Sequence, residues 1–152
     1  MIGDKNYLIA YNDGERTIVD LVDSRELHCV LGELARENNT PFALDLSAAF
    51  AGFVRCVGAD STRTFTMPEV AACAGVDQHK AEHWARRGIL PSPAALPARG
   101  SGQLRRWTYE QAFLAAVLGC LDRNGLHWKA IRSVQEGYTR AMEREPATTA
   151  AQ

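Results

Sequence analysis

The stretch from Thr66 to Trp107 places the strongest constraint on how this chain can fold. It holds two short helical patterns separated by Gly75 and Val76, then a segment rich in proline, alanine and glycine, then a basic return. Two helices joined by so tight a turn pack at a steep angle and need further elements to complete their core. The rest of the chain must supply that support.

The first helix of this stretch has a clear start and a clear end. Thr66 can accept hydrogen bonds from free N–H groups, and Glu69 completes a capping box. Pro68 stands in the first turn, where the helix loses no donor. Gly75 can adopt the left-handed conformation that ends a helix. The pattern therefore predicts a helix that begins after Thr66 and stops at Gly75.

A second short helix is predicted after the cap residue Asp77. Ala81, Trp84 and Ala85 form its buried stripe. The other side chains are expected to face outward: Gln78, His79, Lys80, Glu82, His83, Arg86 and Arg87. Such donors on a short helix suit the major groove of DNA, with base edges near the helix start and phosphates around it. A polar face that is merely solvated is the commoner case for a single helix.

A loop follows this second helix. Residues 91–102 hold three prolines and two glycines, which exclude a regular element. Arg99, Arg105 and Arg106 bracket the return of the chain. We predict a wing, a two-stranded loop whose arginines reach phosphates or the minor groove.

Two longer helices are predicted after the wing. Thr108 and Gln111 form a second capping box, and the first helix ends at Asn124-Gly125. Its predicted apolar stripe contains Ala112, Phe113, Ala116, Val117, Cys120 and Leu121. The last helix starts near Trp128 and carries Ile131, Val134 and Tyr138. Residues 146–152 are low in complexity and are expected to form a disordered tail.

The first sixty residues alternate strand and helix patterns. A β-hairpin is expected around the turn residues 12–15, because Asp-Gly tolerates positive φ. A helix capped by Ser24, a short strand over residues 41–46 and a helix capped by Ser47 follow. The expected fold class is α+β: a small ββαβα domain over residues 1–60 and a mainly helical winged domain over residues 64–145. Residues 60–63 are polar and predict a linker.

Charge is distributed unevenly along the chain. Residues 1–63 hold six Lys and Arg against ten Asp and Glu, a net charge of −4, and residues 64–152 carry a net charge of +3. Such asymmetry indicates a nucleic-acid-binding part joined to something else.

The sequence offers little support for catalysis or metal binding. Four cysteines lie far apart without a Cys-x-x-Cys pair, so we expect reduced, buried thiols in place of a metal or redox centre. No phosphate-binding glycine loop or nucleophile with a base beside it is present, so we expect neither an enzyme nor a cofactor. No apolar run approaches the ~20 residues that span a membrane, and no signal peptide opens the chain, so a soluble, cytoplasmic protein is expected.

From about residue 64 to residue 134 the sequence resembles a MerR-type winged helix-turn-helix domain. The matching pieces are TMPEVAACAGV, WARRGILP, RRWTYEQ and LDRNGLHWKAI, in the family's order and approximate spacing. The resemblance implies double-stranded DNA as the partner. It assigns the DNA contacts to residues of the second helix and the wing return: His79, Lys80, His83, Arg86, Arg87 and Arg105. The N-terminal domain has no recognised counterpart.

Two departures from the family pattern stand out. Lys80-Ala81-Glu82 replaces the family's Thr-Leu-Arg recognition segment, and Glu82 would repel phosphate, although it could accept from a cytosine amino group. Only about a dozen residues separate Val134 from Pro146, so the family's long C-terminal dimerisation helix and effector region are not expected here. The leading hypothesis is a DNA-binding transcriptional regulator that binds as a homodimer, with residues 1–63 as the expected pairing or sensing surface. The alternative is a protein-interaction module whose winged domain docks a protein partner, with the N-terminal domain as a further protein-binding surface.

Overall fold

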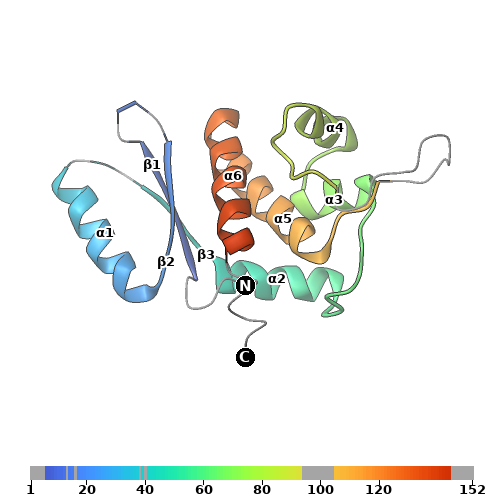
Figure 1. The fold of residues 1–152 in the computed structure, drawn as a ribbon, viewed down its shortest axis with the longest axis horizontal. Helices are drawn as coiled ribbons and strands as arrows, with labels where there is room; N and C mark the ends of the chain where they lie inside the picture. Colours follow the sequence, from blue (N-terminus) through green and yellow to red (C-terminus); the bar gives the residue numbers. More distant parts are fainter. Residues whose placement is uncertain are drawn as a thin grey trace. The chain divides into compact units, whose positions relative to one another are not determined.

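The computed structural model describes residues 6–12, 14–15, 17–37, 39, 41–93 and 105–144. Within them the chain forms a three-stranded antiparallel sheet and six helices, which confirms the expected α+β class (Figure 1). It divides into two compact units: a sheet unit, residues 1–51 with 136–152, and a helical unit, residues 52–135. The division falls inside two helices and does not coincide with the expected linker at residues 60–63.

The sheet has the strand order β2-β1-β3. Strands β1 (Tyr7–Asn12) and β2 (Thr17–Val22) form the expected hairpin, and β3 (Phe42–Asp45) pairs antiparallel with the other edge of β1. Gly14 has a φ of 102° and donates its N–H to Asn12 Oδ1 at 2.8 Å. A positive φ is the conformation that glycine adopts without strain, and it lets the chain reverse here.

One face of the sheet packs against helix α1 (Ser24–Arg36). Ile9, Val22 and Leu34 form the buried centre of this contact. Side chains alternate between the two faces of a strand, and Ile9 and Val22 point to the same face. Leu34 lies on the apolar stripe of α1 that faces them. This small core holds α1 against the sheet.

The opposite face of the sheet meets the second half of helix α6 (Trp128–Arg144). Ala10 is buried and pairs with Val19, so both side chains share this face. A Cβ atom placed on Gly137 would lie 3.7 Å from the Val19 side chain, an ordinary contact distance. The sheet unit therefore draws on both ends of the chain.

Two helix caps differ from expectation by one or two residues. Asp23, and not Ser24, caps α1 by accepting from two first-turn N–H groups at 2.9 and 2.8 Å. In α2 (Leu46–Val57) Asp45 accepts from a first-turn N–H at 3.1 Å, so the expected cap Ser47 is also wrong. Aspartate and serine both suit this position, and the carboxylate adds a favourable interaction with the helix dipole.

The helical unit is built around helix α5 (Tyr109–Arg123). Its buried residues occupy nearly the whole circumference: Tyr109, Ala112, Phe113, Leu114, Ala115, Val117, Leu118, Gly119 and Leu121. Ala116 and Cys120, placed on the predicted stripe, are only half-buried. A helix that is apolar all round is one that neighbours surround, which a single-stripe interpretation does not anticipate.

Aromatic rings hold α2 and the segment before α3 against the start of α5. The Phe53 ring lies edge-on to Tyr109 and Phe113, with centroids 5.1 and 5.6 Å apart. Phe65 lies 6.3 Å from Phe53. The Tyr109 hydroxyl donates to the Gly58 carbonyl oxygen at 2.6 Å, which satisfies the polar end of this buried ring.

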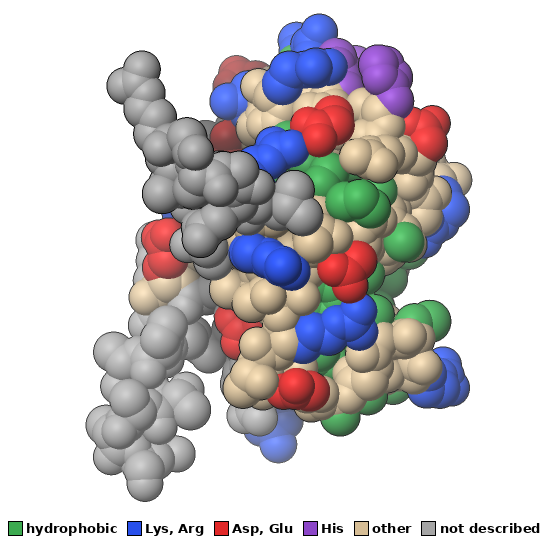
Figure 2. Space-filling view, turned by 90° about the vertical axis from the view of Figure 1, so that its right-hand side faces the viewer, with side chains coloured by type: hydrophobic (Ala, Val, Ile, Leu, Met, Phe, Trp, Pro, Cys, Tyr) green, Lys and Arg blue, Asp and Glu red, His purple; other side chains and the backbone are tan. Residues whose placement is uncertain are grey.

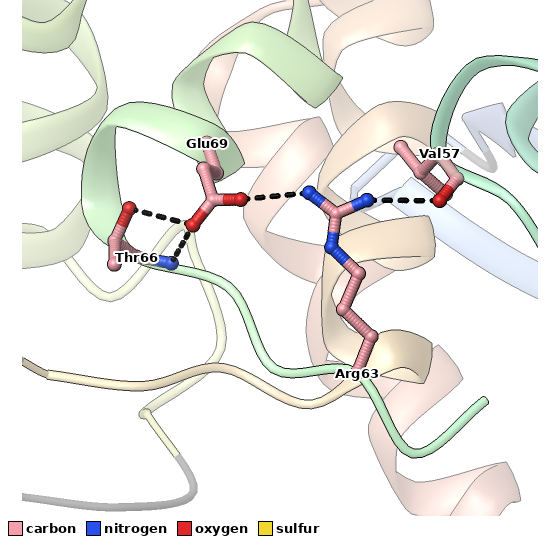
Figure 3. A network of polar contacts seen from close by, with 4 residues as sticks. All are labelled: Val57, Arg63, Thr66 and Glu69. Atoms are coloured by element: carbon pink, nitrogen blue, oxygen red, sulfur yellow. Dashed lines mark hydrogen bonds and ion pairs between the residues drawn. The ribbon is translucent and has the colours of Figure 1, made fainter. Parts of the chain in front are cut away.

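Residues 60–63 are part of the helical unit. Arg63 Nη1 donates to the Val57 carbonyl oxygen at 2.8 Å, and Nη2 donates to Glu69 Oε2 at 2.7 Å (Figure 3). The same guanidinium lies 4.6 Å above the centre of the Phe65 ring. Arg63 thus connects the end of α2 to the start of α3 (Met67–Ala74). Residues 60–63 lack apolar periodicity, so the sequence did not indicate this connection.

The capping box of α3 is present as expected. Glu69 Oε1 accepts from the N–H and the hydroxyl of Thr66 at 3.1 and 3.0 Å (Figure 3). The hydrogen bond from Arg63, followed by that from the Thr66 N–H, lowers the pKa of Glu69 from its ordinary value. A carboxylate with a lowered pKa stabilises the fold at neutral pH and loses that contribution as the pH falls through the lowered pKa.

Glu69→Gln is therefore expected to destabilise the protein by about 1 kcal/mol at pH 7, a modest value because solvent screens this half-exposed site. The difference from wild type should shrink as the pH falls from 7 through the lowered pKa of Glu69, because the wild-type carboxylate then becomes protonated. Urea unfolding across this pH range measures this. Glu110→Gln, in the first turn of α5, is the matched control, and an equal loss there would contradict the assignment.

The cysteines are less buried than expected. All four are free; Cys29 and Cys56 are exposed, and Cys73 and Cys120 are half-buried. Burial raises the pKa of the Cys73 thiol, which favours its neutral form. Burial of the thiols was predicted from the apolar residues next to each cysteine in sequence. Successive residues of a helix point in different directions, so an apolar neighbour does not imply that the cysteine is buried.

Candidate nucleic-acid interface

A tight turn joins α3 to helix α4 (Gln78–Arg86). Gly75 ends α3 with a φ of 70° and donates its N–H to the Ala72 carbonyl oxygen at 3.1 Å. Asp77 then caps α4, because its carboxylate accepts from the Lys80 N–H at 2.7 Å. The two expected short helices and the left-handed glycine between them are therefore present.

Helix α4 buries one side and exposes the other. Ala81 and Trp84 are 1% and 3% exposed and face the core of the helical unit. Four of the predicted interface residues are exposed on the remaining surface: Gln78, His79, His83 and Arg86. Histidine and basic side chains gather on this part of the surface (Figure 2). Within the described part of the chain these four side chains have no hydrogen-bonding or ion-pair partner, so their polar groups face solvent.

Lys80 lies at the border of this surface and is paired. Its Nζ lies 2.7 Å from Asp122 Oδ2 near the end of α5, and 5.6 Å from the centre of the Trp84 ring. The Lys80 side chain therefore extends toward Trp84 and the end of α5. The Lys80 side chain is 42% exposed, so solvent still reaches it.

Arg105, on the return from the predicted wing, is paired with α4. Its Nη2 lies 2.7 Å from Glu82 Oε1, and its guanidinium lies 5.5 Å from the centre of the Trp107 ring. The Glu82 carboxylate, which raised the concern of phosphate repulsion, is thus neutralised within the chain. Arg106 is exposed beside this pair in sequence.

The two ends of the proline-rich loop are held together. Trp107 exchanges both backbone hydrogen bonds with Phe65 at 2.9 Å, and its Nε1 donates to the Pro91 carbonyl oxygen at 3.0 Å. Gln111 Nε2 donates to the Ser92 carbonyl oxygen at 2.7 Å. The predicted wing itself and Arg99 lie outside the described residues.

A second group of basic residues adjoins the end of α4, and only part of it was predicted. The Arg87 guanidinium lies 5.2 Å from the centre of the Trp128 ring, and Lys129 Nζ lies 5.7 Å from the same ring. A Cβ atom built on Gly88 would lie 4.0 Å from Arg132 Nε, which is an ordinary contact distance. The Arg132 side chain therefore lies beside Gly88. Arg87 was predicted, but Lys129 and Arg132 were missed because α6 was treated as a supporting helix.

The described residues contain no group of three or more His, Cys, Asp or Glu side chains that could hold a metal ion. No helix in the described part of the chain is both long enough and apolar enough to cross a membrane. No protein-family model, curated protein or solved structure matches the chain.

Proposed function

We propose that the protein is a DNA-binding transcriptional regulator whose helix α4 enters the major groove of a duplex. The supporting observation is the outward face of α4. His79 and His83 are one turn apart, Arg86 follows on the same face, and none has a described partner. Imidazole and guanidinium groups can donate to base edges and phosphates.

The surroundings of α4 supply further phosphate contacts. Arg87, Lys129 and Arg132 cluster around the end of α4 and the start of α6. Arg106 provides an exposed cation at the root of the predicted wing. Phosphate contacts of this kind fix the register of a protein on DNA without reading its sequence.

One short recognition helix contacts few base pairs, so two copies are expected to bind one site. A homodimer in the cytoplasm is therefore part of the proposal, and the sheet unit is the proposed pairing or protein-binding surface. Cofactors, a metal and catalysis have no part in this function.

The test measures binding to a labelled random-sequence duplex by fluorescence anisotropy at several salt concentrations. Wild-type affinity should fall linearly with salt on logarithmic axes. Arg86→Ala should weaken binding and reduce the magnitude of the slope by about one. Arg55→Ala is the control, because this exposed arginine lies on α2, at the end of the helical unit opposite to α4 in Figure 1. Salt-independent binding, or equal effects of both variants, would contradict the proposal.

A protein-interaction module is the second candidate. It is favoured by the pairing of Lys80 with Asp122 and of Arg105 with Glu82, which leaves less free positive charge beside α4. Absence of duplex binding by wild type at low salt would favour this candidate over the first.

A further inference from the structure

Two carboxylates form ion pairs with cations that could otherwise contact the phosphates of a duplex. Glu82 Oε1 and Arg105 Nη2 are 2.7 Å apart, as are Asp122 Oδ2 and Lys80 Nζ. Solvent reaches both pairs, because the side chains of Glu82 and Arg105 are 33% and 35% exposed and those of Asp122 and Lys80 are 26% and 42% exposed. An incoming anion can therefore compete for either cation.

A carboxylate and a phosphate offer cations the same chemistry, namely charged oxygen acceptors for N–H donors. Arg105 and Lys80 cannot neutralise a phosphate fully while a carboxylate remains beside them. Moving either cation to DNA also leaves a negative carboxylate close to the duplex, where like charges repel. Both effects lower the affinity that these cations would otherwise provide.

We propose that Glu82 and Asp122 are built-in competitors of DNA phosphate that set the affinity and the salt dependence of duplex binding. This inference rests on the proposed duplex binding. It separates the interface into two classes of residue. Arg86 and the two histidines of α4 are available in the free protein, whereas Arg105 and Lys80 become available only when an ion pair exchanges.

The experiment compares Glu82→Gln and Asp122→Asn with wild type on a labelled random-sequence duplex, across several salt concentrations. Each substitution frees one cation and removes one nearby negative charge. We expect roughly two- to fivefold tighter binding at low salt, in line with the modest strength of exposed ion pairs. The logarithmic salt slope should steepen by about 0.9 for each freed cation.

Glu110→Gln is the matched control, because it makes the same change in charge at the first turn of α5. Asp122 lies twelve positions further along that helix, or about 18 Å at the usual rise per residue. The double variant Glu82→Gln with Arg105→Ala should lose the gain of the single variant. Urea unfolding of each variant shows whether all of them are folded under the binding conditions.

The outcomes distinguish this inference from the function on which it rests. Salt-dependent binding by wild type, with Glu82→Gln and Asp122→Asn no tighter than Glu110→Gln, overturns the inference and leaves the function standing. Weaker binding by Glu82→Gln also overturns it, because Glu82 would then hold Arg105 in a binding position. Absence of binding by wild type and by both variants overturns both. Binding by the variants alone supports competition by Glu82 and Asp122 and contradicts duplex binding by the wild-type protein.

Discussion

Gly119→Ala is expected to destabilise the fold by about 3 kcal/mol and to lower the melting temperature by on the order of 10 °C. A Cβ atom at this position would lie 1.8 Å from the Ala74 carbonyl oxygen and 2.6 Å from its carbonyl carbon. Both atoms belong to the backbone, so no side-chain rotation can relieve the overlap. Helices α3 and α5 would have to move apart, and urea and thermal unfolding measure the cost.

Gly32→Ala is the control for this prediction. Gly32 lies inside α1, and a Cβ atom there would meet nothing within 4 Å. Alanine has the higher helix propensity, so this variant should gain about 0.5–1 kcal/mol. If Gly119→Ala had wild-type stability, Gly119 of α5 would not lie as close to the Ala74 backbone of α3 as the 1.8 Å contact requires. Because α3 supports α4, Gly119→Ala should also weaken any duplex binding.

Trp107→Ala is expected to cost about 3–5 kcal/mol, the usual range for removing a fully buried aromatic side chain. Trp107 is 0% exposed, and its Nε1 donates to the Pro91 carbonyl oxygen. Trp107→Phe should cost less, about 1–3 kcal/mol, because it retains a ring and loses chiefly the hydrogen bond. Urea unfolding of both variants separates the packing contribution from that of the hydrogen bond.

Trp128→Ala is the matched control for Trp107→Ala. The same side chain is removed, but Trp128 is only half-buried and packs against the cations Arg87 and Lys129. We expect it to cost roughly 1 kcal/mol, since exposed cation–π contacts contribute little. Equal losses for the two tryptophans would contradict the central position of Trp107 at the base of the loop.

Much of the local structure followed from the sequence. Gly14 and Gly75 were expected at reversals that need a positive φ, and both adopt one. Thr66 with Glu69, and Thr108 with Gln111, form the expected capping boxes. These features depend on residues within four positions of each other, so local patterns are enough to predict them.

The candidate site was predicted in composition but not in electrostatics. The helix that carries Gln78, His79, His83 and Arg86 was expected, as was the exposure of these four side chains. The ion pairs of Lys80 and Arg105 were not, because their partners lie 42 and 23 positions away in sequence. Spacing along a helix indicates which side chains share a face, but it does not indicate which distant charges meet them.

By itself the sequence determined which segments form helices and strands and, to within one or two residues, where they begin and end, because caps, turns and periodic apolar residues act within a few positions. Only the tertiary structure decided which residues of α5 are buried, why Gly119 must lack a side chain, and which cations are already neutralised. The physical reason is that these properties depend on atoms that folding brings together from distant parts of the chain. Ala74 against Gly119 and Asp122 against Lys80 are the clearest cases.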